Sequence, residues 1–177
     1  MKTKFLLPVL LLSLISCSIE TDSVVERNGL YYEDLANSIS GFTPFTGEVT
    51  GKEKGRVEDG KKEGKWVGYH DDGDLRYRGS YKNGKEEGEW VYYHNDGDLR
   101  YRGNYKNGKG DGEWVYYHEN GQVSSKGNYK NGKRDGEWVY YHENGQISMK
   151  GSYKNGEKAS ELNNDQPQNL AKALTVE

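Results

Sequence analysis

A repeat of 24 residues governs what this chain can fold into. The same residue types return at that spacing from position 64 to about position 158, which gives four tandem copies. The recurring residues are Trp66, Trp90, Trp114 and Trp138, then His70, His94, His118 and His142, then Tyr81, Tyr105, Tyr129 and Tyr153, with Asn-Gly pairs that start at Asn83, Asn107, Asn131 and Asn155. Short tandem units bury their apolar faces against one another, so they form an elongated array without a central core.

Each copy has the pattern of a β-hairpin. Residues 90–94 read Trp-Val-Tyr-Tyr-His, a run that favours a strand, and the Asn-Asp-Gly that follows is a turn signal. The return strand alternates, with Leu99, Tyr101, Gly103 and Tyr105 on one face and Arg100, Arg102, Asn104 and Lys106 on the other. We therefore expect an all-β fold, an elongated repeat array of 24-residue antiparallel β-hairpins that form one twisted sheet.

Comparison of the copies indicates which face of the return strand is packed. Leu75 and its equivalents stay aliphatic and Tyr81 recurs unchanged, whereas position 76 drifts from Arg to Ser. The face that carries Leu75 and Tyr81 should therefore be the packed one. For the first strand two arrangements stay open: the packed pair is either Trp90 with Tyr92 or Val91 with Tyr93.

Composition and motifs argue against catalysis. From residue 18 onward about 29% of the residues are apolar, nearly half of them aromatic, which leaves little interior for a deep cleft. The sequence has no Gly-rich phosphate loop, no Gly-x-Ser-x-Gly and no metalloprotease motif. Equivalent histidines of stacked hairpins lie about 9.5 Å apart, too far to share one zinc ion. We expect a protein that is not an enzyme and binds no cofactor or metal.

The first 17 residues have the pattern of a secretory signal peptide. Lys2 and Lys4 precede an apolar run over residues 5–15, which is too short to span a bilayer. The ending Leu-Ile-Ser-Cys at residues 14–17 resembles a bacterial lipobox, and Cys17 is the only cysteine in the chain. We expect a lipid on Cys17 and an exported protein anchored in the bacterial cell envelope. The residue after Cys17 is Ser18 rather than the Asp that is associated with inner-membrane retention in bacterial lipoproteins. This favours the outer membrane in a Gram-negative cell.

The rest of the chain divides by composition. Residues 18–41 are acidic and show no sustained apolar period, so we expect a flexible acidic tether. Residues 42–63 read as a degenerate N-terminal capping repeat, because residues 55–60 align with residues 79–84. The four full repeats are 64–87, 88–111, 112–135 and 136–158, and residues 159–177 form a polar tail.

The repeat resembles a known family. Residues 112–122 read Gly-Glu-Trp-Val-Tyr-Tyr-His-Glu-Asn-Gly-Gln, and residues 126–133 read Lys-Gly-Asn-Tyr-Lys-Asn-Gly-Lys. This pattern is similar to the MORN repeat variant, and residues 28–32 and 44–49 resemble that family's usual lead-in. Such arrays are common in bacterial envelope and secreted proteins and are often named YwqK-type antitoxins of toxin-antitoxin systems. The resemblance implies a MORN-like sheet and partner binding of the antitoxin kind.

The charges are close to balanced within each repeat. Residues 64–87 carry five basic and five acidic residues, and residues 88–111 carry four of each. Binding to anionic lipid or nucleic acid needs clusters of basic residues, and the linear sequence shows none in the repeats. We therefore expect no nucleic-acid binding, and membrane contact through the lipid on Cys17.

Three functional hypotheses follow. The first is a non-catalytic scaffold that binds an unknown protein partner in the envelope, because Tyr and Trp anchor interfaces. Its candidate surface comprises Trp66, Tyr69, Trp90, Tyr93, Trp114, Tyr117, Trp138 and Tyr141. The second is binding of choline or a cell-wall glycan, since aromatic hairpins can hold a quaternary ammonium group by cation-π attraction. The third is a spacer whose repeats bind nothing.

Overall fold

The computed structural model describes residues 18–20, 24–27, 29–33 and 44–163. They form a 12-stranded sheet in the order β1-β4-β5 and onward to β14, beside a separate β2-β3 hairpin. The strands before the repeats are β1 (Ser18–Glu20), β2 (Val24–Arg27), β3 (Leu30–Glu33), β4 (Gly47–Thr50) and β5 (Glu53–Glu58). Those of the repeats are β6 (Lys61–Tyr69), β7 (Leu75–Lys82), β8 (Lys85–Tyr93), β9 (Leu99–Lys106), β10 (Lys109–Tyr117), β11 (Val123–Lys130), β12 (Lys133–Tyr141), β13 (Ile147–Lys154) and β14 (Glu157–Asn163).

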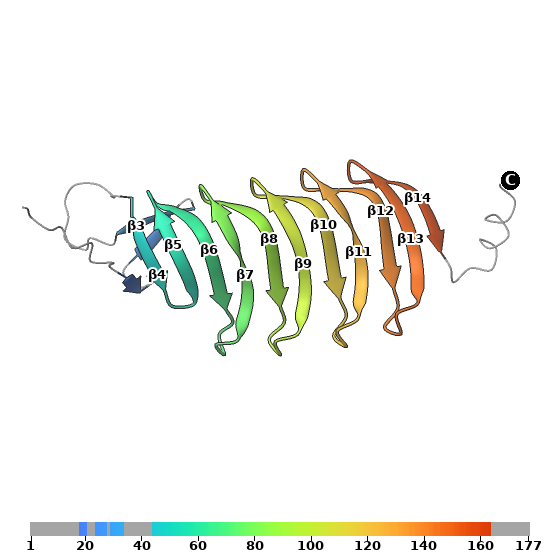
Figure 1. The fold of residues 1–177 in the computed structure, drawn as a ribbon, viewed down its shortest axis with the longest axis horizontal. Coiled ribbons are helices and arrows are strands. Elements are labelled where there is room, and N and C mark those ends of the chain that lie inside the picture. Colours follow the sequence, from blue (N-terminus) through green and yellow to red (C-terminus); the bar gives the residue numbers. More distant parts are fainter. Residues whose placement is uncertain (1–17, 21–23, 28, 34–43, 164–177) are drawn as a thin grey trace, which may run out of the picture.

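The sheet is an open meander, and the predicted all-β array of antiparallel hairpins is confirmed (Figure 1). Each strand from β4 to β14 pairs antiparallel with its sequence neighbours, and only β1 pairs in parallel, with β4. No helix among the described residues is long and apolar enough to cross a bilayer.

Two kinds of connection alternate along the two long edges of the sheet. At one edge the four turns from β7 onward are Asn-Gly pairs with positive φ at both residues, as at Asn83 (52°) and Gly84 (77°). The turn before them, Asp59-Gly60, has the same geometry. That geometry matches the twist of the flanking strands, and Asn and Gly adopt it at low cost. At the other edge the loops are longer, and each histidine closes its own loop, as where the His70 amide donates to the Asp74 carbonyl (2.8 Å).

Hydrogen bonds between equivalent connections hold successive repeats in register. At the Asn-Gly edge, the amide of Gly84 donates to the carbonyl of Lys62 (2.9 Å), and Glu63 accepts from the amide of Asn83 (2.7 Å). At the loop edge, Nε2 of His70 lies 3.3 Å from the carbonyl oxygen of Tyr93 in the next repeat. Nε2 of His118 likewise lies 3.0 Å from the carbonyl oxygen of Tyr141. These two histidines therefore have a structural role, because they join neighbouring repeats.

Tryptophans packed on glycines form the interior of the array. The Trp90 ring is 1% exposed, and a Cβ built on Gly79 of β7 would lie only 2.2 Å from it. The ring can lie flat on β7 because Gly79 has no side chain, and its Nε1 donates to the Ser80 carbonyl (3.2 Å). The same close approach recurs in the other repeats, at Trp66 over Gly55, Trp114 over Gly103 and Trp138 over Gly127.

The structure settles which residues of the first strand share the tyrosine face. Trp90 and Tyr92 both contact Tyr77, with ring centroids 5.5 and 5.8 Å apart respectively. Val91 is paired with Arg78 and Arg102 on the opposite face. Of the two arrangements left open by the sequence, Trp90 with Tyr92 is the one on the aromatic face.

The N-terminal end of the array is closed by residues that precede the full repeats. Tyr31, Phe45, Val49 and Val57 form a buried cluster with Trp66. The amide of Tyr31 donates to the carbonyl of Gly60 (2.7 Å), which ties β3 to the first tight turn. These contacts lie where a degenerate capping repeat was predicted, and they extend it to Tyr31.

Part of the segment predicted to be a flexible tether is therefore structured. Strands β1, β2 and β3 all lie within residues 18–41, and Tyr31 is 7% exposed. The physical reason is the exposed edge of β4 and the open apolar end of the array, both of which need a cover. The predicted signal peptide with Cys17, residues 34–41 of the tether and residues 164–177 of the tail lie outside the described residues.

Candidate functional site

One face of the sheet carries a continuous set of aromatic rings, which we call the aromatic face. Trp90, Trp114 and Trp138 are each flanked by two tyrosines in edge-on contact, as at Trp114, where the Tyr105 and Tyr129 centroids lie 5.1 and 5.2 Å away. Trp66 has one such contact, with Tyr81. Edge-to-face packing of this kind adds stability beyond the burial of area. The aromatic face consists of Tyr77, Tyr81, Trp90, Tyr92, Tyr101, Tyr105, Trp114, Tyr116, Tyr129, Trp138, Tyr140 and Tyr153, with Trp66 and Tyr31 at its N-terminal end.

Basic side chains of the protein itself lie on this face over two of the tryptophans. The Lys62 ammonium is 4.3 Å from the centroid of Trp66, and the Arg134 guanidinium is 4.2 Å from that of Trp138. Lys62 and Arg134 are equivalent residues, three repeats apart. Cation-π attraction stabilises both arrangements, so the aromatic face is chemically able to hold an organic cation.

A carboxylate completes the arrangement around Lys62. Glu53 accepts from Lys62 Nζ (2.6 Å), from the hydroxyl of Tyr77 and from that of Tyr31 (3.4 Å). Burial of the Glu53 carboxyl opposes its ionisation, but these hydrogen bonds outweigh burial and hold its pKa below its usual value. The first repeat thus has a complete internal site for its own cation.

Several tyrosines of the aromatic face have raised pKa values and are neutral hydrogen-bonding groups at neutral pH. Burial raises the pKa of Tyr105 to about 12. Burial and the hydrogen bond to Tyr153 together raise the pKa of Tyr140 to about 12. Burial likewise raises the pKa values of Tyr92 and Tyr116. Their hydroxyls can therefore both donate to and accept from a bound partner.

The eight residues predicted as an interaction surface do not lie on one face. Trp66, Trp90, Trp114 and Trp138 are buried on the aromatic face, at 7% exposure or less. Tyr69, Tyr93, Tyr117 and Tyr141 are half-buried and stand two positions after the valines of the opposite face. Lys54 lies 4.9 Å from the ring of Tyr69, and Arg102 donates to the hydroxyl of Tyr117 (3.1 Å). The candidate surface predicted from the sequence omitted the tyrosines of the aromatic face. Gly103 and its equivalents are the signal that could have identified them, because each tryptophan packs on such a glycine beside these tyrosines.

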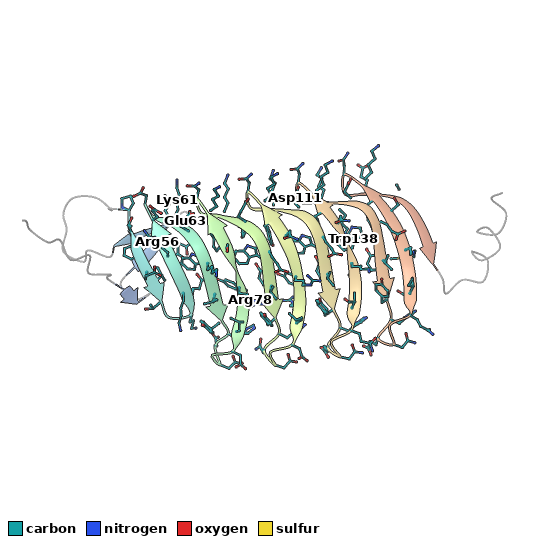
Figure 2. The ribbon with its side chains drawn as sticks, viewed as in Figure 1. Arg56, Lys61, Glu63, Arg78, Asp111 and Trp138 are labelled. Carbon is teal, nitrogen blue, oxygen red and sulfur yellow. The ribbon has the colours of Figure 1, made fainter. Side chains whose placement is uncertain are left out.

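The topology also separates charges that the linear count had balanced. Exposed lysines at or beside the tight turns share one edge (Figure 2): Lys61, Lys82, Lys85, Lys106, Lys109, Lys130, Lys133 and Lys154. Half-buried carboxylates, among them Glu63 and Asp111, lie at the same edge and bind turn amides. The opposite edge carries exposed acids in the loops, at Asp71, Asp72, Asp74, Asp96, Asp98, Glu119 and Glu143. The repeats are neutral one by one, yet the two edges differ in the sign of their exposed charge.

The described surface has several open hollows. One of about 340 Å³ is lined by Tyr69, His70, Asp71, Asp72, Arg76 and Asn95 at the loop edge. Another, of about 290 Å³, lies over Val67 and Arg78 on the opposite face. Within the described ranges, no three His, Cys, Asp or Glu side chains are grouped so that they could hold a metal ion.

The fold and its aromatic face define a β-hairpin repeat protein, in which each unit contributes two strands and one tryptophan to an open sheet. The family model described as MORN repeat variant matches four times, at residues 62–83, 86–107, 110–131 and 134–155. The repeat array therefore belongs to the MORN repeat variant family.

Other comparisons add little to this assignment. No curated protein matches the chain. A solved structure titled "Crystal structure of GtfA/B complex bound to UDP and GlcNAc" is similar at 11% identity and a TM-score of 0.29. The match covers 86% of this chain but 31% of that one.

Proposed function

We propose that this protein is a membrane-anchored lipoprotein of the bacterial envelope whose aromatic face binds a protein partner without catalysis. The observation that supports it is the continuity of the aromatic face, which runs through all four repeats. Among the described residues, β4 to β14 lie in one sheet, and the β2-β3 hairpin packs against the N-terminal end of its aromatic face through Tyr31. From Tyr81 onward the tyrosines of this face are half-buried, and tyrosine and tryptophan are enriched among the anchor residues of protein interfaces.

The anchoring part of the proposal depends on residues 1–17. A short basic start, an apolar run and Leu-Ile-Ser-Cys together fit a lipobox, and lipidation gives the single cysteine of an exported chain a purpose. One acyl chain binds membranes weakly and two bind stably. The modified Cys17 would then hold the array at the membrane surface, within reach of envelope proteins.

A second candidate is binding of a small quaternary ammonium ligand such as choline. The observation that favours it is the position of Lys62 and Arg134 over tryptophan rings, which shows that the rings accept cations. A choline titration that quenches tryptophan fluorescence in a saturable way would support this candidate. An unchanged signal would leave the protein-binding proposal standing.

The proposal predicts that partner capture depends on the aromatic face. Removing two of its half-buried rings, Tyr116→Ala with Tyr140→Ala, should reduce crosslinked capture of the partner from native membranes by at least about tenfold, as expected for interface anchors. Tyr117→Ala with Tyr141→Ala removes equal ring area from the opposite face and should leave capture within about twofold. Capture is quantified by mass spectrometry and normalised to folded protein.

Three further outcomes test the separate parts of the proposal. In a Cys17→Ser chain, the protein should leave the membrane fraction if lipid on Cys17 is the anchor; full membrane retention would contradict anchoring. Equal capture by both double variants would contradict binding through the aromatic face. Recovery of a cytosolic toxin as the specific partner would replace the envelope scaffold with an antitoxin function.

A further inference from the structure

The third and fourth repeats surround their tryptophans with three equivalent tyrosines. Trp138 has Tyr129 and Tyr153 edge-on, at 5.2 and 6.4 Å, and Tyr140 beside it at 6.4 Å. Trp114 has the equivalent Tyr105 and Tyr129 edge-on, at 5.1 and 5.2 Å, and Tyr116 at 6.1 Å. The two sites share these three rings and hydroxyls. Trp114 has in addition Tyr101 stacked at 5.8 Å, where the fourth repeat has Ser125.

The two sites differ in what lies over the tryptophan. In the fourth repeat, the guanidinium of Arg134 lies over Trp138 and donates to the hydroxyl of Tyr140 (2.7 Å). The equivalent residue in the third repeat is Gly110, which has no side chain. None of the Lys or Arg side chains that the structure describes lies over the ring of Trp114.

The exposure of the four tryptophans follows this difference. Trp66 and Trp90, whose repeats carry Lys62 and Glu86 at this position, are 1% exposed, and Trp138 is 0% exposed. Trp114 is 7% exposed. All four rings are buried, and that of Trp114 in the third repeat is the most exposed of them.

A carboxylate that could attract a cationic incoming group, Glu86, lies in the neighbouring repeat. A Cβ built on Gly108 would lie 3.4 Å from Oε2 of Glu86, so this carboxylate reaches the turn that leads into Gly110. Among the described residues, no Lys, Arg or His lies within ion-pair distance of Glu86. Glu86 would attract a cation over Trp114 from about two strand spacings away. Glu53 of the first repeat, by contrast, pairs directly with Lys62 at 2.6 Å.

We propose that the site formed by Trp114, Tyr105, Tyr116 and Tyr129, which we call the Gly110 site, binds an arginine side chain of the protein partner, with Glu86 as a nearby carboxylate. The inference deepens the proposed function and depends on it for the identity of the ligand as a protein. Arg134 is the template for the bound group, since it occupies the equivalent set of rings. Glu86 offsets the repulsion from Arg134, because both lie about two strand spacings, some 9.5 Å, from the position of the bound cation.

The test uses the full chain labelled with ¹⁵N-tryptophan, in which each indole N–H gives one NMR signal. Titration with acetyl-Gly-Arg-Gly-amide should shift the Trp114 indole signal in a saturable way and leave the Trp66 and Trp138 signals in place. The same peptide with citrulline, which is neutral and of similar shape, should bind at least tenfold more weakly. Equal shifts with both peptides would overturn recognition of the cation.

Variants at the site provide matched controls. Gly110→Arg supplies the site with its own cation, as Arg134 does, and should weaken peptide binding at least tenfold; Gly110→Ala adds no cation and should retain most of it. Glu86→Gln should weaken binding severalfold. Peptide binding that is unchanged in Gly110→Arg would overturn the inference, and so would choline binding tighter than the arginine peptide. If membrane capture depends on the aromatic face while the Trp114 signal stays fixed, only the Gly110 site fails and the proposed function stands.

Discussion

A Trp90→Ala variant should have a free energy of unfolding about 3–5 kcal/mol lower than the wild-type chain. Trp90 is 1% exposed and contacts Tyr77, Tyr81, Tyr92 and Tyr105, so its removal leaves a cavity between two repeats. It also leaves the Ser80 carbonyl without the indole donor. In an array each repeat contacts only its neighbours, so the loss at one interface weakens coupling along the sheet. Urea denaturation followed by circular dichroism measures the change.

A surface control separates this effect from a general sensitivity of the array. Lys106→Ala removes an exposed side chain beside a tight turn and should change the free energy of unfolding by less than about 0.5 kcal/mol. A loss under about 1 kcal/mol for Trp90→Ala would show that the tryptophans do not hold the repeats together.

A Gly103→Ala variant should lose about 3 kcal/mol of stability, at the upper end of the range for over-packed substitutions. The added Cβ would lie 2.3 Å from the ring of Trp114, which is 7% exposed and has tyrosines on both sides. The ring cannot retreat without breaking its edge-on contacts with Tyr105 and Tyr129. Either the sheet or the ring must move, and both responses are costly in a close-packed interior.

Gly110→Ala is the matched control, because it adds one methyl group beside the same ring. Here the Cβ would lie 3.3 Å from Nε1 of Trp114, a contact that small adjustments relieve. The substitution also restricts the unfolded chain, which favours the folded state by about 0.4–1 kcal/mol. Gly110→Ala should therefore stay within about 0.5 kcal/mol of wild type in the same denaturation experiment. Equal losses at both positions would contradict the packing of Trp114 on Gly103.

The hairpin fold was predictable because its signals are local and repeated. The spacing of Trp66 to Trp90, the Asn-Gly pairs and the alternation from Leu99 to Tyr105 each report on a few neighbouring residues. The sequence left open on which face of the sheet Trp90 lies, because that depends on a contact between strands. On β8, Gly88 has a positive φ of 75°, and the pairing register shifts on both sides, between Arg78 and Ser80 of β7 and between Tyr92 and Tyr93 in the pairing with β9. A simple alternation cannot describe such a strand.

The candidate site was less predictable, because it depends on which repeats lie side by side. Charge counted along the chain hides the lysine edge, since each turn's lysines come from the same repeat as the acidic loop on the opposite edge. The tether prediction failed to anticipate the burial of Tyr31, which covers the open end of the array. The difference between Gly110 and Arg134 is visible in the sequence. Its consequence for the site can be understood only from the structure, which places Arg134 over Trp138.

Site-specific photo-crosslinking in native membranes tests the central claim most directly. A photoreactive residue is placed at Tyr116 on the aromatic face or at Tyr117, its chain neighbour on the opposite face; both positions are half-buried. If the aromatic face binds the partner, position 116 gives one discrete protein adduct, and position 117 gives little. Adducts of equal yield from both positions, or none from position 116, would contradict the assignment of this face as the binding surface.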